Sequence, residues 1–395
     1  MDGFTTRAIR AATRAPRVDQ RPTSVPIYQA ATFSSADAEE LGAVTTGATR
    51  GYVYSRLGNP TVDALADVAA ELHGAEAGFA AATGMAAIHL AVGSLVRAGD
   101  RIVATHSLYG TTRSLFVTAF ARYGVETAFV DSADHAAVEA ALAAAPARVL
   151  YLETISNPTI AVADLPVLAS LGHRHGAAVV VDNTFASPAL CRPLEQGADV
   201  VVESGTKYFS GHSDVLAGIV VGSRERIDAV RALHVETGAT LAPLSAFLVL
   251  RGIPTLALRM ERHAATAARL AAFLEASRGV ARVLHPALPS HPDHAVAARL
   301  LASGGGMLAL ELAGGARAAR AFVDALRIPE RTASLGSIHS IVVHPPSTTH
   351  RQLDDAELAQ AGIGPGLLRC SVGLEDADDL LADMAQALEV ARGAG

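Results

Sequence analysis

The sequence has few cysteines, few charges and no long hydrophobic run. Its two cysteines, Cys191 and Cys370, lie far apart in the 395 residues, which excludes a disulfide framework and is typical of a reducing compartment. No run of eighteen apolar residues occurs, so no membrane-spanning helix is predicted. The N-terminus lacks the continuous apolar core of a secretory signal, and we therefore expect a soluble, cytoplasmic protein.

Missing patterns exclude several functional classes. The net charge of −7 is spread along the chain without a basic block, which argues against nucleic acid or an anionic membrane as a partner. There is no GxxxxGK[S/T] loop, no GxGxxG fingerprint after a predicted strand and no GxSxG motif. A P-loop or Rossmann-type nucleotide enzyme and a serine hydrolase are therefore poorly supported. The histidines of HPALPSHPDH and GHSD are not expected to bind a metal.

The hydrophobic pattern of the sequence predicts an α/β protein in which two domains follow an N-terminal arm. Residues 1–57 have weak periodicity and several prolines, and we expect an irregular arm that contacts a neighbouring subunit. Residues 58–252 alternate strands with helices, which predicts a large domain with a mostly parallel, seven-stranded sheet covered on both faces. Residues 253–395 begin with a long amphipathic helix and mix helices with short strands, as in a smaller α+β domain.

The expected elements follow the hydrophobic pattern. Strands are predicted at 76–82, 101–105, 125–130, 148–153, 177–182, 200–203 and 218–222, and then at 306–312, 340–343 and 367–372. Helices are predicted from residue 60 or 61 to Gly74, at 84–96, 112–123, 133–144, 164–175, 253–278, 293–302 and 315–326, and from after 372 to about 391.

Polar residues follow three of the predicted strands, where open α/β sheets bind their ligands. Lys207 lies in ESGTKYFSGHSD, just past the strand 200–203, where partial burial would lower its pKa and make it a nucleophile. Taken alone, a lysine there is more often a solvated loop residue. Asp182 ends VVVD and either caps the next turn or faces a buried cation. Gly84 and Met85 open a helix whose free N–H groups could bind an anion.

Together these residues meet the requirements of a pyridoxal phosphate site. The cofactor needs a lysine for the Schiff base, an acid for the ring nitrogen, and N–H and hydroxyl groups around its phosphate. The residues that could supply them are Lys207, Asp182, Gly84, Met85, Ser204 and Thr206.

Eight motifs carry a resemblance to a known family. In order they are YVYSRLGNPT, TGMAAI, SLYGTTRSLF, ETISNPT, VVVDNTFASP, ESGTKYFSGHSD, ASLGS and LRCSVGLE, spread over residues 52–375. The chain resembles the Cys/Met-metabolism family of pyridoxal-phosphate enzymes. The resemblance implies the fold type I (aspartate-aminotransferase-like) fold and a homotetramer built from two tight dimers.

The resemblance also implies roles for individual residues. Lys207 corresponds to the Schiff-base lysine that moves protons, and Asp182 to the partner of the pyridinium nitrogen. Tyr109 corresponds to the tyrosine that stacks on the ring and protonates the leaving group. The expected cofactor-binding set is Lys207, Gly84, Met85, Tyr109, Asn157, Asp182, Ser204 and Thr206, with Tyr54 and Arg56 reaching a neighbouring subunit's phosphate. The expected substrate-binding set is Arg369 for the α-carboxylate, with Ser334, Tyr54, Thr111 and Ser114.

Departures from the family's patterns bear on the substrate. Ser114 stands where enzymes acting on cystathionine usually have arginine, and Ala333 where a glutamate precedes the serine of ASLG. Both changes remove charge and favour an uncharged thioether such as methionine. Thr111 replaces the cysteine frequent in methionine γ-lyases, and His234-Val235 replaces their Lys-Asp pair, so that match is incomplete.

The first expectation is therefore γ-elimination of L-methionine to methanethiol, 2-oxobutanoate and ammonia. Cystathionine γ-lyase or γ-synthase comes next. An O-acylhomoserine sulfhydrylase comes third, because those enzymes usually contain an insertion that this chain lacks. A non-catalytic pyridoxal-binding protein is disfavoured, since it would not need all of Lys207, Asp182, Tyr109 and Arg369.

Overall fold

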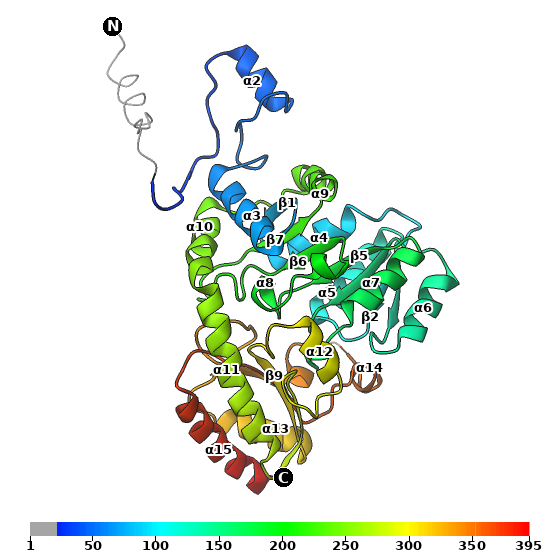
Figure 1. Cartoon of the computed structure of the whole chain (residues 1–395), viewed down its shortest axis with the longest axis vertical. Coiled ribbons are helices and arrows are strands. Elements are labelled where there is room, and N and C mark those ends of the chain that lie inside the picture. Colours follow the sequence, from blue (N-terminus) through cyan, green and yellow to red (C-terminus); the bar gives the residue numbers. More distant parts are fainter. Residues whose placement is uncertain (1–21, 352, 395) are drawn as a thin grey trace.

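The computed structural model describes residues 22–351 and 353–394, which form two β-sheets with helices packed around them (Figure 1). The large sheet has the strand order β1-β7-β6-β5-β4-β2-β3. Its strands are β1 (Ala77–Ala81), β2 (Arg101–Thr105), β3 (Glu126–Val130), β4 (Val149–Glu153), β5 (Ala178–Asp182), β6 (Val200–Glu203) and β7 (Gly218–Gly222). Only β7 runs antiparallel to its neighbours, which confirms the mostly parallel seven-stranded sheet.

Helices cover both faces of this sheet because its central strands are apolar on both sides. In β5, Val180 packs into one hydrophobic cluster while Val179 and Val181 pack into another, as the alternation of side chains along a strand requires. The cluster around Val180 includes α4 (Gly84–Gly93) and α9 (Arg224–Thr237). The opposite face carries α3 (Pro60–His73), α6 (His135–Ala144), α7 (Leu165–Arg174) and α10 (Pro243–Gly252).

The second sheet lies in the C-terminal part of the chain. Its five strands have the order β10-β11-β12-β9-β8, with β8 (Val280–Leu284), β9 (Met307–Leu312), β10 (Glu330–Arg331), β11 (Ile341–Val343) and β12 (Leu367–Ser371). The helices of this part are α11 (Leu256–Glu275), α12 (His294–Leu300), α13 (Gly315–Ala325), α14 (Asp355–Gln360) and α15 (Ala377–Ala394). The arm, large and small units were predicted to divide at 57/58 and 252/253, and this division stays a prediction.

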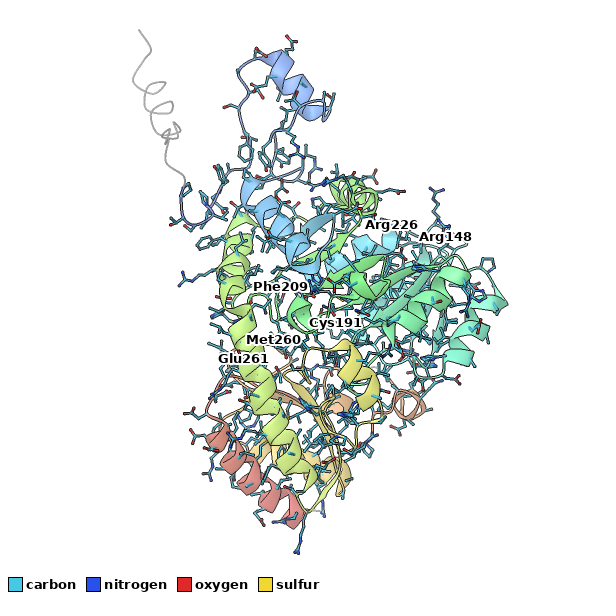
Figure 2. The ribbon with its side chains drawn as sticks, viewed as in Figure 1. Arg148, Cys191, Phe209, Arg226, Met260 and Glu261 are labelled. Atoms are coloured by element: carbon cyan, nitrogen blue, oxygen red, sulfur yellow. The ribbon has the colours of Figure 1, made fainter. Side chains whose placement is uncertain are left out.

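One helical stretch, Pro243–Glu275, is long and apolar enough by length and composition to cross a membrane. It comprises α10, one 3-10 turn and α11, and Figure 1 shows it running down one side of the molecule, from the large sheet to the smaller one. Residues such as Met260 and Leu270 are buried, and α11 packs on β8, β9 and α15. A core helix passes the same composition test. Figure 2 shows Met260, Cys191 and Phe209 inside the molecule, whereas Arg148 points outward.

Several elements differ from the sequence expectation. The arm is not wholly irregular, because α2 (Ala38–Thr45) forms where Asp37 caps the N–H of Glu40. No residue of α2 is buried, and Figure 1 shows the helix standing away from the sheets. The helix predicted over 112–123 divides into α5 (Gly110–Ser114) and a π-helical turn over Leu115–Phe120. The expected elements also omitted α8 (Ser187–Leu190), α9, α10, α14, β8 and β10.

Candidate active site

A cavity opens at the carboxyl ends of β4, β5 and β6, and contains about 970 Å³ of empty space, part of it open to solvent. It is lined by Thr83, Gly84, Met85, Ile88, Tyr109, Glu153, Ile155, Asn157, Asp182, Thr184, Phe185, Ser204, Thr206, Lys207, Leu216, Ala333, Ser334, Leu335, Thr349 and Arg369. The lining combines the large sheet with three segments from the C-terminal part of the chain. Ten residues predicted from the sequence meet here, namely Gly84, Met85, Tyr109, Asn157, Asp182, Ser204, Thr206, Lys207, Ser334 and Arg369.

Lys207 lies in the turn after β6 and points into this cavity. Its Nζ donates a hydrogen bond to Ser334 Oγ at 2.8 Å. Burial, together with the nearby Arg369 guanidinium, lowers the pKa of the Lys207 amine to about 8. A desolvated amine of this kind is uncharged more often than a surface lysine and is a better nucleophile. Lys207 is therefore not the solvated loop residue that the motif alone would allow.

Lys207 is also the only lysine in all 395 residues, since the other 31 of the 32 Lys and Arg residues are arginine. Any chemistry that requires a side-chain amine of this chain must use it. The presence of a single lysine in the sequence therefore identifies Lys207 as the candidate amine independently of any motif.

The turn that carries Lys207 is held from behind by Arg259 of α11. This buried guanidinium donates to the carbonyl oxygens of Tyr208 at 2.7 Å and Phe209 at 3.3 Å. It also donates to the carbonyl of Gly252 at 2.9 Å, so it joins the lysine turn to the start of the C-terminal part.

Asp182 ends β5 between two parallel neighbours and is buried at the cavity floor. Its Oδ1 accepts hydrogen bonds from the Thr184 N–H at 3.0 Å and the Thr184 hydroxyl at 2.6 Å. Burial raises the pKa of the Asp182 carboxyl to about 6, against the effect of Thr184. Asp182 thus serves both alternatives left open by the sequence, because it caps a turn and also lines the cavity as a buried acid suited to a cationic partner.

The N-terminus of α4 also lines the cavity. The Thr83 side chain accepts from the N–H of Ala86, which leaves the N–H groups of Gly84 and Met85 without an acceptor inside the helix. A Cβ at Gly84 would lie 2.8 Å from Ser204 Cβ, so only glycine permits this close packing. The N–H groups at the helix N-terminus and the hydroxyls of Ser204 and Thr206 could together donate hydrogen bonds to a phosphate.

Arg369 of β12 lines the remaining wall and is 3% exposed. Its Nη1 donates to Asn157 Oδ1 at 2.9 Å and its Nη2 to the Ser334 carbonyl at 2.8 Å, whereas its Nε is buried without a partner. Burial lowers the pKa of Arg369 to about 10, so the group stays cationic near neutrality. A buried guanidinium with an unused donor fits a substrate carboxylate.

Glu153 is a cavity residue that sequence reasoning missed. Its Oε1 accepts the backbone N–H of Tyr109 at 2.7 Å and its Oε2 accepts that of Asn157 at 2.9 Å. Burial and the negative Asp182 raise the pKa of the Glu153 carboxyl well above its usual range. Its position at the end of a buried strand, like that of Asp182, was the available signal. Glu153 fixes the backbone of two cavity residues.

Four predicted site residues lie outside the cavity of their own chain. Tyr54 is exposed, and the Arg56 guanidinium stacks near its ring and donates to the Val235 carbonyl at 2.6 Å. Thr111 and Ser114 lie on the exposed side of α5, and neither lines the cavity. Their assignment to the substrate pocket therefore stays a prediction.

The residues present fit pyridoxal phosphate. One end of the cavity offers N–H and hydroxyl donors for a dianionic phosphate, and the floor offers a buried carboxylate for a protonated ring nitrogen. The only lysine lines the same cavity, and its pKa is lowered. Lys207, Asp182, Gly84, Met85, Ser204 and Thr206 would hold the group, as the sequence predicted.

Comparisons with known proteins agree with this fit. The chain is 45% identical over 391 residues to the L-methionine gamma-lyase of Pseudomonas putida, with 98% of each protein covered. It is 39% identical over 385 residues to the O-succinylhomoserine sulfhydrylase of Pseudomonas aeruginosa, covering 98% of this chain and 95% of that protein. The crystal structure of cystathionine gamma synthase from Xanthomonas oryzae superposes with a TM-score of 0.90 at 38% identity, covering 94% of each chain. Residues 5–389 match the family described as Cys/Met metabolism PLP-dependent enzyme, and the chain belongs to that family.

Proposed function

We propose that this enzyme catalyses the γ-elimination of L-methionine to methanethiol, 2-oxobutanoate and ammonia. One observation carries the choice of substrate. Among the described residues that line the cavity, the only basic side chains are Lys207 and Arg369. Lys207 is used by the chemistry, and Arg369 binds the α-carboxylate. No basic side chain of this lining is then left to bind a second, distal carboxylate of the substrate. The wall nearby contains Ala333, Leu335 and Leu216, which suit a methyl thioether.

Pyridoxal phosphate, when bound, supplies an electron sink that stabilises negative charge next to the substrate's α-carbon. Arg369 binds the α-carboxylate through its free Nε edge, while Asn157 holds the other side of the guanidinium. Lys207 Nζ, held by Ser334, accepts protons from the substrate carbon atoms and returns them. A pKa of about 8 suits this task, because both protonation states are populated near neutral pH.

Tyr109 is the proposed acid for the leaving group. Its ring lines the cavity, and Glu153 fixes its backbone through the 2.7 Å hydrogen bond. Its phenol donates a proton to the departing sulfur, so that neutral methanethiol leaves.

The deciding experiment gives the purified enzyme methionine, homocysteine, cystathionine and O-succinylhomoserine with sulfide in separate assays. Release of 2-oxobutanoate and methanethiol from methionine, at a kcat/KM above that for the other three, is expected. Fast turnover of cystathionine with no keto acid from methionine would overturn the choice of substrate while leaving the cofactor assignment intact.

Elimination or replacement at the γ-carbon of cystathionine or an O-acylhomoserine is the second candidate. It is supported by the 39% identity to an O-succinylhomoserine sulfhydrylase. The expected difference in length does not separate the two candidates, because this chain already covers 95% of that sulfhydrylase. The assays with cystathionine, and with O-succinylhomoserine and sulfide, test this second candidate directly.

We also propose a cytoplasmic homotetramer made of two dimers with shared active sites. Support comes from the exposed Tyr54 and Arg56, which lie outside their own cavity, and from α2, which buries no residue. Two inactive variants, Lys207→Ala and Arg56→Ala, should regain about a quarter of the activity when mixed and reassembled, since some sites then combine two intact halves. A mixture without activity, or a monomer by light scattering, would contradict shared sites.

A further inference from the structure

A buried contact between a histidine and a glutamate lies directly behind the active site. His73 is the last residue of α3 and Glu203 the last of β6, and their side chains are 0% and 2% exposed. His73 Nε2 lies 3.0 Å from Glu203 Oε1, a close electrostatic contact that does not meet hydrogen-bond geometry. A carboxylate this deep is unfavourable unless partners compensate its lost hydration, so the contact is a specific feature of the fold.

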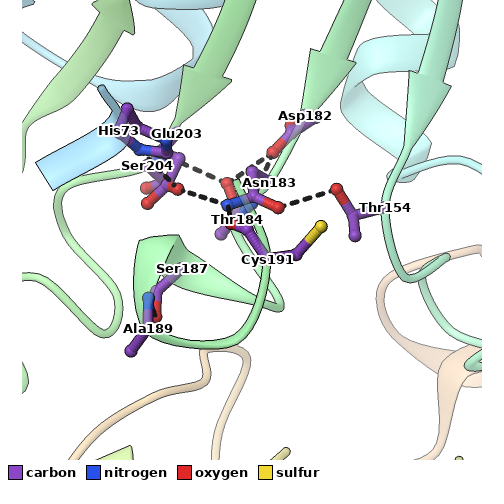
Figure 3. Close-up of polar contacts among 10 residues, drawn as sticks. All are labelled: His73, Thr154, Asp182, Asn183, Thr184, Ser187, Ala189, Cys191, Glu203 and Ser204. Atoms are coloured by element: carbon purple, nitrogen blue, oxygen red, sulfur yellow. Dashed lines mark hydrogen bonds and ion pairs between the residues drawn. The ribbon is translucent and has the colours of Figure 1, made fainter. Parts of the chain in front are cut away.

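The pair is part of a polar network that joins three strand ends (Figure 3). Asn183 Nδ2 donates to the same Glu203 oxygen at 2.9 Å and to the Cys191 carbonyl at 3.0 Å. The Thr154 hydroxyl donates to Asn183 Oδ1 at 2.7 Å. The network therefore ties α3 to the ends of β4, β5 and β6, where the cavity opens.

Its members are sequence neighbours of cavity residues. Asn183 follows Asp182, and Glu203 precedes Ser204. Successive side chains of an extended segment point to opposite sides, so one set faces the cavity and the other faces the network. On the cavity side, Thr184 donates to Asp182 and its hydroxyl accepts the N–H of Ser204 at 2.9 Å. Fixing Asn183 against Glu203 thus fixes the separation of Asp182 and Ser204.

The pair also acts on the cavity through other contacts. Burial is the main cause of the raised Asp182 pKa, and the negative charge of Glu203 adds to it. The His73 ring stacks on Phe209 with centroids 6.4 Å apart, two residues after Lys207. Both ends of the pair therefore contact segments that carry the cofactor-binding residues.

We propose that His73 and Glu203 are a positioning pair that sets the distance between the acid for the ring nitrogen, Asp182, and the phosphate-binding Ser204. The pair thereby determines how firmly the enzyme retains its cofactor. Neither side chain lines the cavity, so neither is catalytic. The proposal rests on the cofactor-binding residues assigned above and is independent of which substrate is used.

The test measures cofactor release from the holoenzyme, followed as loss of visible absorbance after dilution into a trap for free pyridoxal phosphate. Glu203→Gln keeps the size of the side chain and an acceptor for Asn183, but loses the charge that His73 contacts. Because charge-assisted contacts are about twice as strong as neutral ones, release is expected to be about tenfold faster. The KM for the best substrate of the panel should change less than twofold, whereas general loosening of the site would raise it.

The exchanged double variant, His73→Glu with Glu203→His, restores the contact with its polarity reversed and should bring release to within about threefold of the wild type. Glu195→Gln is the matched control, because Glu195 is half exposed and pairs with Arg192 at the surface. Its release rate should equal that of the wild type.

Two results would overturn the proposal: equal release rates for Glu203→Gln and Glu195→Gln, or an exchanged variant that releases cofactor as fast as the single variant. If Glu203→Gln does not fold, His73→Gln replaces it with the same expected tenfold increase. Failure of methionine turnover in the wild type would leave these rates unaffected, so the two proposals fail separately.

Discussion

Replacing Arg259 by methionine should destabilise the enzyme more than any exposed arginine substitution on the same helix. The guanidinium donates to three backbone carbonyls, those of Tyr208, Phe209 and Gly252, and is 4% exposed. Methionine has a similar length but donates no hydrogen bond. The carbonyls of Tyr208 and Phe209 each cost about 1–3 kcal/mol when they lose this donor, whereas the Gly252 carbonyl keeps the Thr255 hydroxyl as a donor. Part of this cost is offset because a buried cation is removed, which leaves a loss of about 3 kcal/mol.

Calorimetry measures this loss, and it suits a chain that has no tryptophan for fluorescence. Unfolding entropy is about 2.1 cal/mol/K per residue, so for these 395 residues a loss of about 3 kcal/mol lowers the melting temperature by roughly 4 °C. Arg262→Met is the matched control one turn away, where the side chain is 49% exposed and lies 3.2 Å from Asp376 Oδ1. The free energy of unfolding of Arg262→Met should differ from that of the wild type by no more than about 1 kcal/mol, as for other surface ion pairs. Equal melting temperatures for the two variants would refute the account of Arg259 as the support of the lysine turn.

Four further predictions follow from the site. Lys207→Ala should abolish both activity and the visible absorption of bound cofactor, and a surviving band would disprove the lysine assignment, because the chain has no other lysine. Arg369→Lys should raise the KM for methionine by about 10-fold or more while the absorption band persists, since an ammonium cannot make the forked contacts with carboxylate, Asn157 and the Ser334 carbonyl. Gly84→Ala should weaken cofactor binding, measured by equilibrium dialysis, because the added Cβ would meet Ser204 at 2.8 Å. In the apoprotein, labelling of Lys207 by an amine-selective reagent should rise with a midpoint near pH 8 rather than the ordinary 10.5. The folded pKa lies below the unfolded one, so the contribution of Lys207 to stability increases with pH between about 8 and 10.5; a midpoint near 10.5 would contradict its burial.

The sequence predicted the large sheet well because most of its strands are short apolar runs, and most of these are separated by helices. Asp182 and Lys207 were found because each follows such a run, and a cofactor explains why a charged residue stands there. Glu153 escaped notice because its partners are the backbone N–H groups of Tyr109 and Asn157, which no residue pattern reports.

The missed elements also have physical reasons. In α9 the buried stripe consists only of Ile227, Val230 and His234, which is too narrow to stand out among charged neighbours. In β8 only the last two residues are buried, so the alternation of a half-buried strand is absent. Thr111 and Ser114 were assigned to the pocket by their distance in sequence from Tyr109. Neither residue lines the cavity of its own chain, and their place in the substrate pocket stays a prediction.

Because the chain has a single lysine and this lysine is buried, proteolysis at Lys207 can report how often the active site opens. A lysine-specific endoprotease can cut this chain only after Lys207, which would leave fragments 1–207 and 208–395. The bond to be cut is followed by Tyr208 and Phe209, whose exposed fractions are 1% and 0%. Cleavage therefore requires the turn to leave the protein interior, and its rate follows the population of that open form when closing is fast. One band on a gel would then measure the free energy of opening at the residue that performs the chemistry.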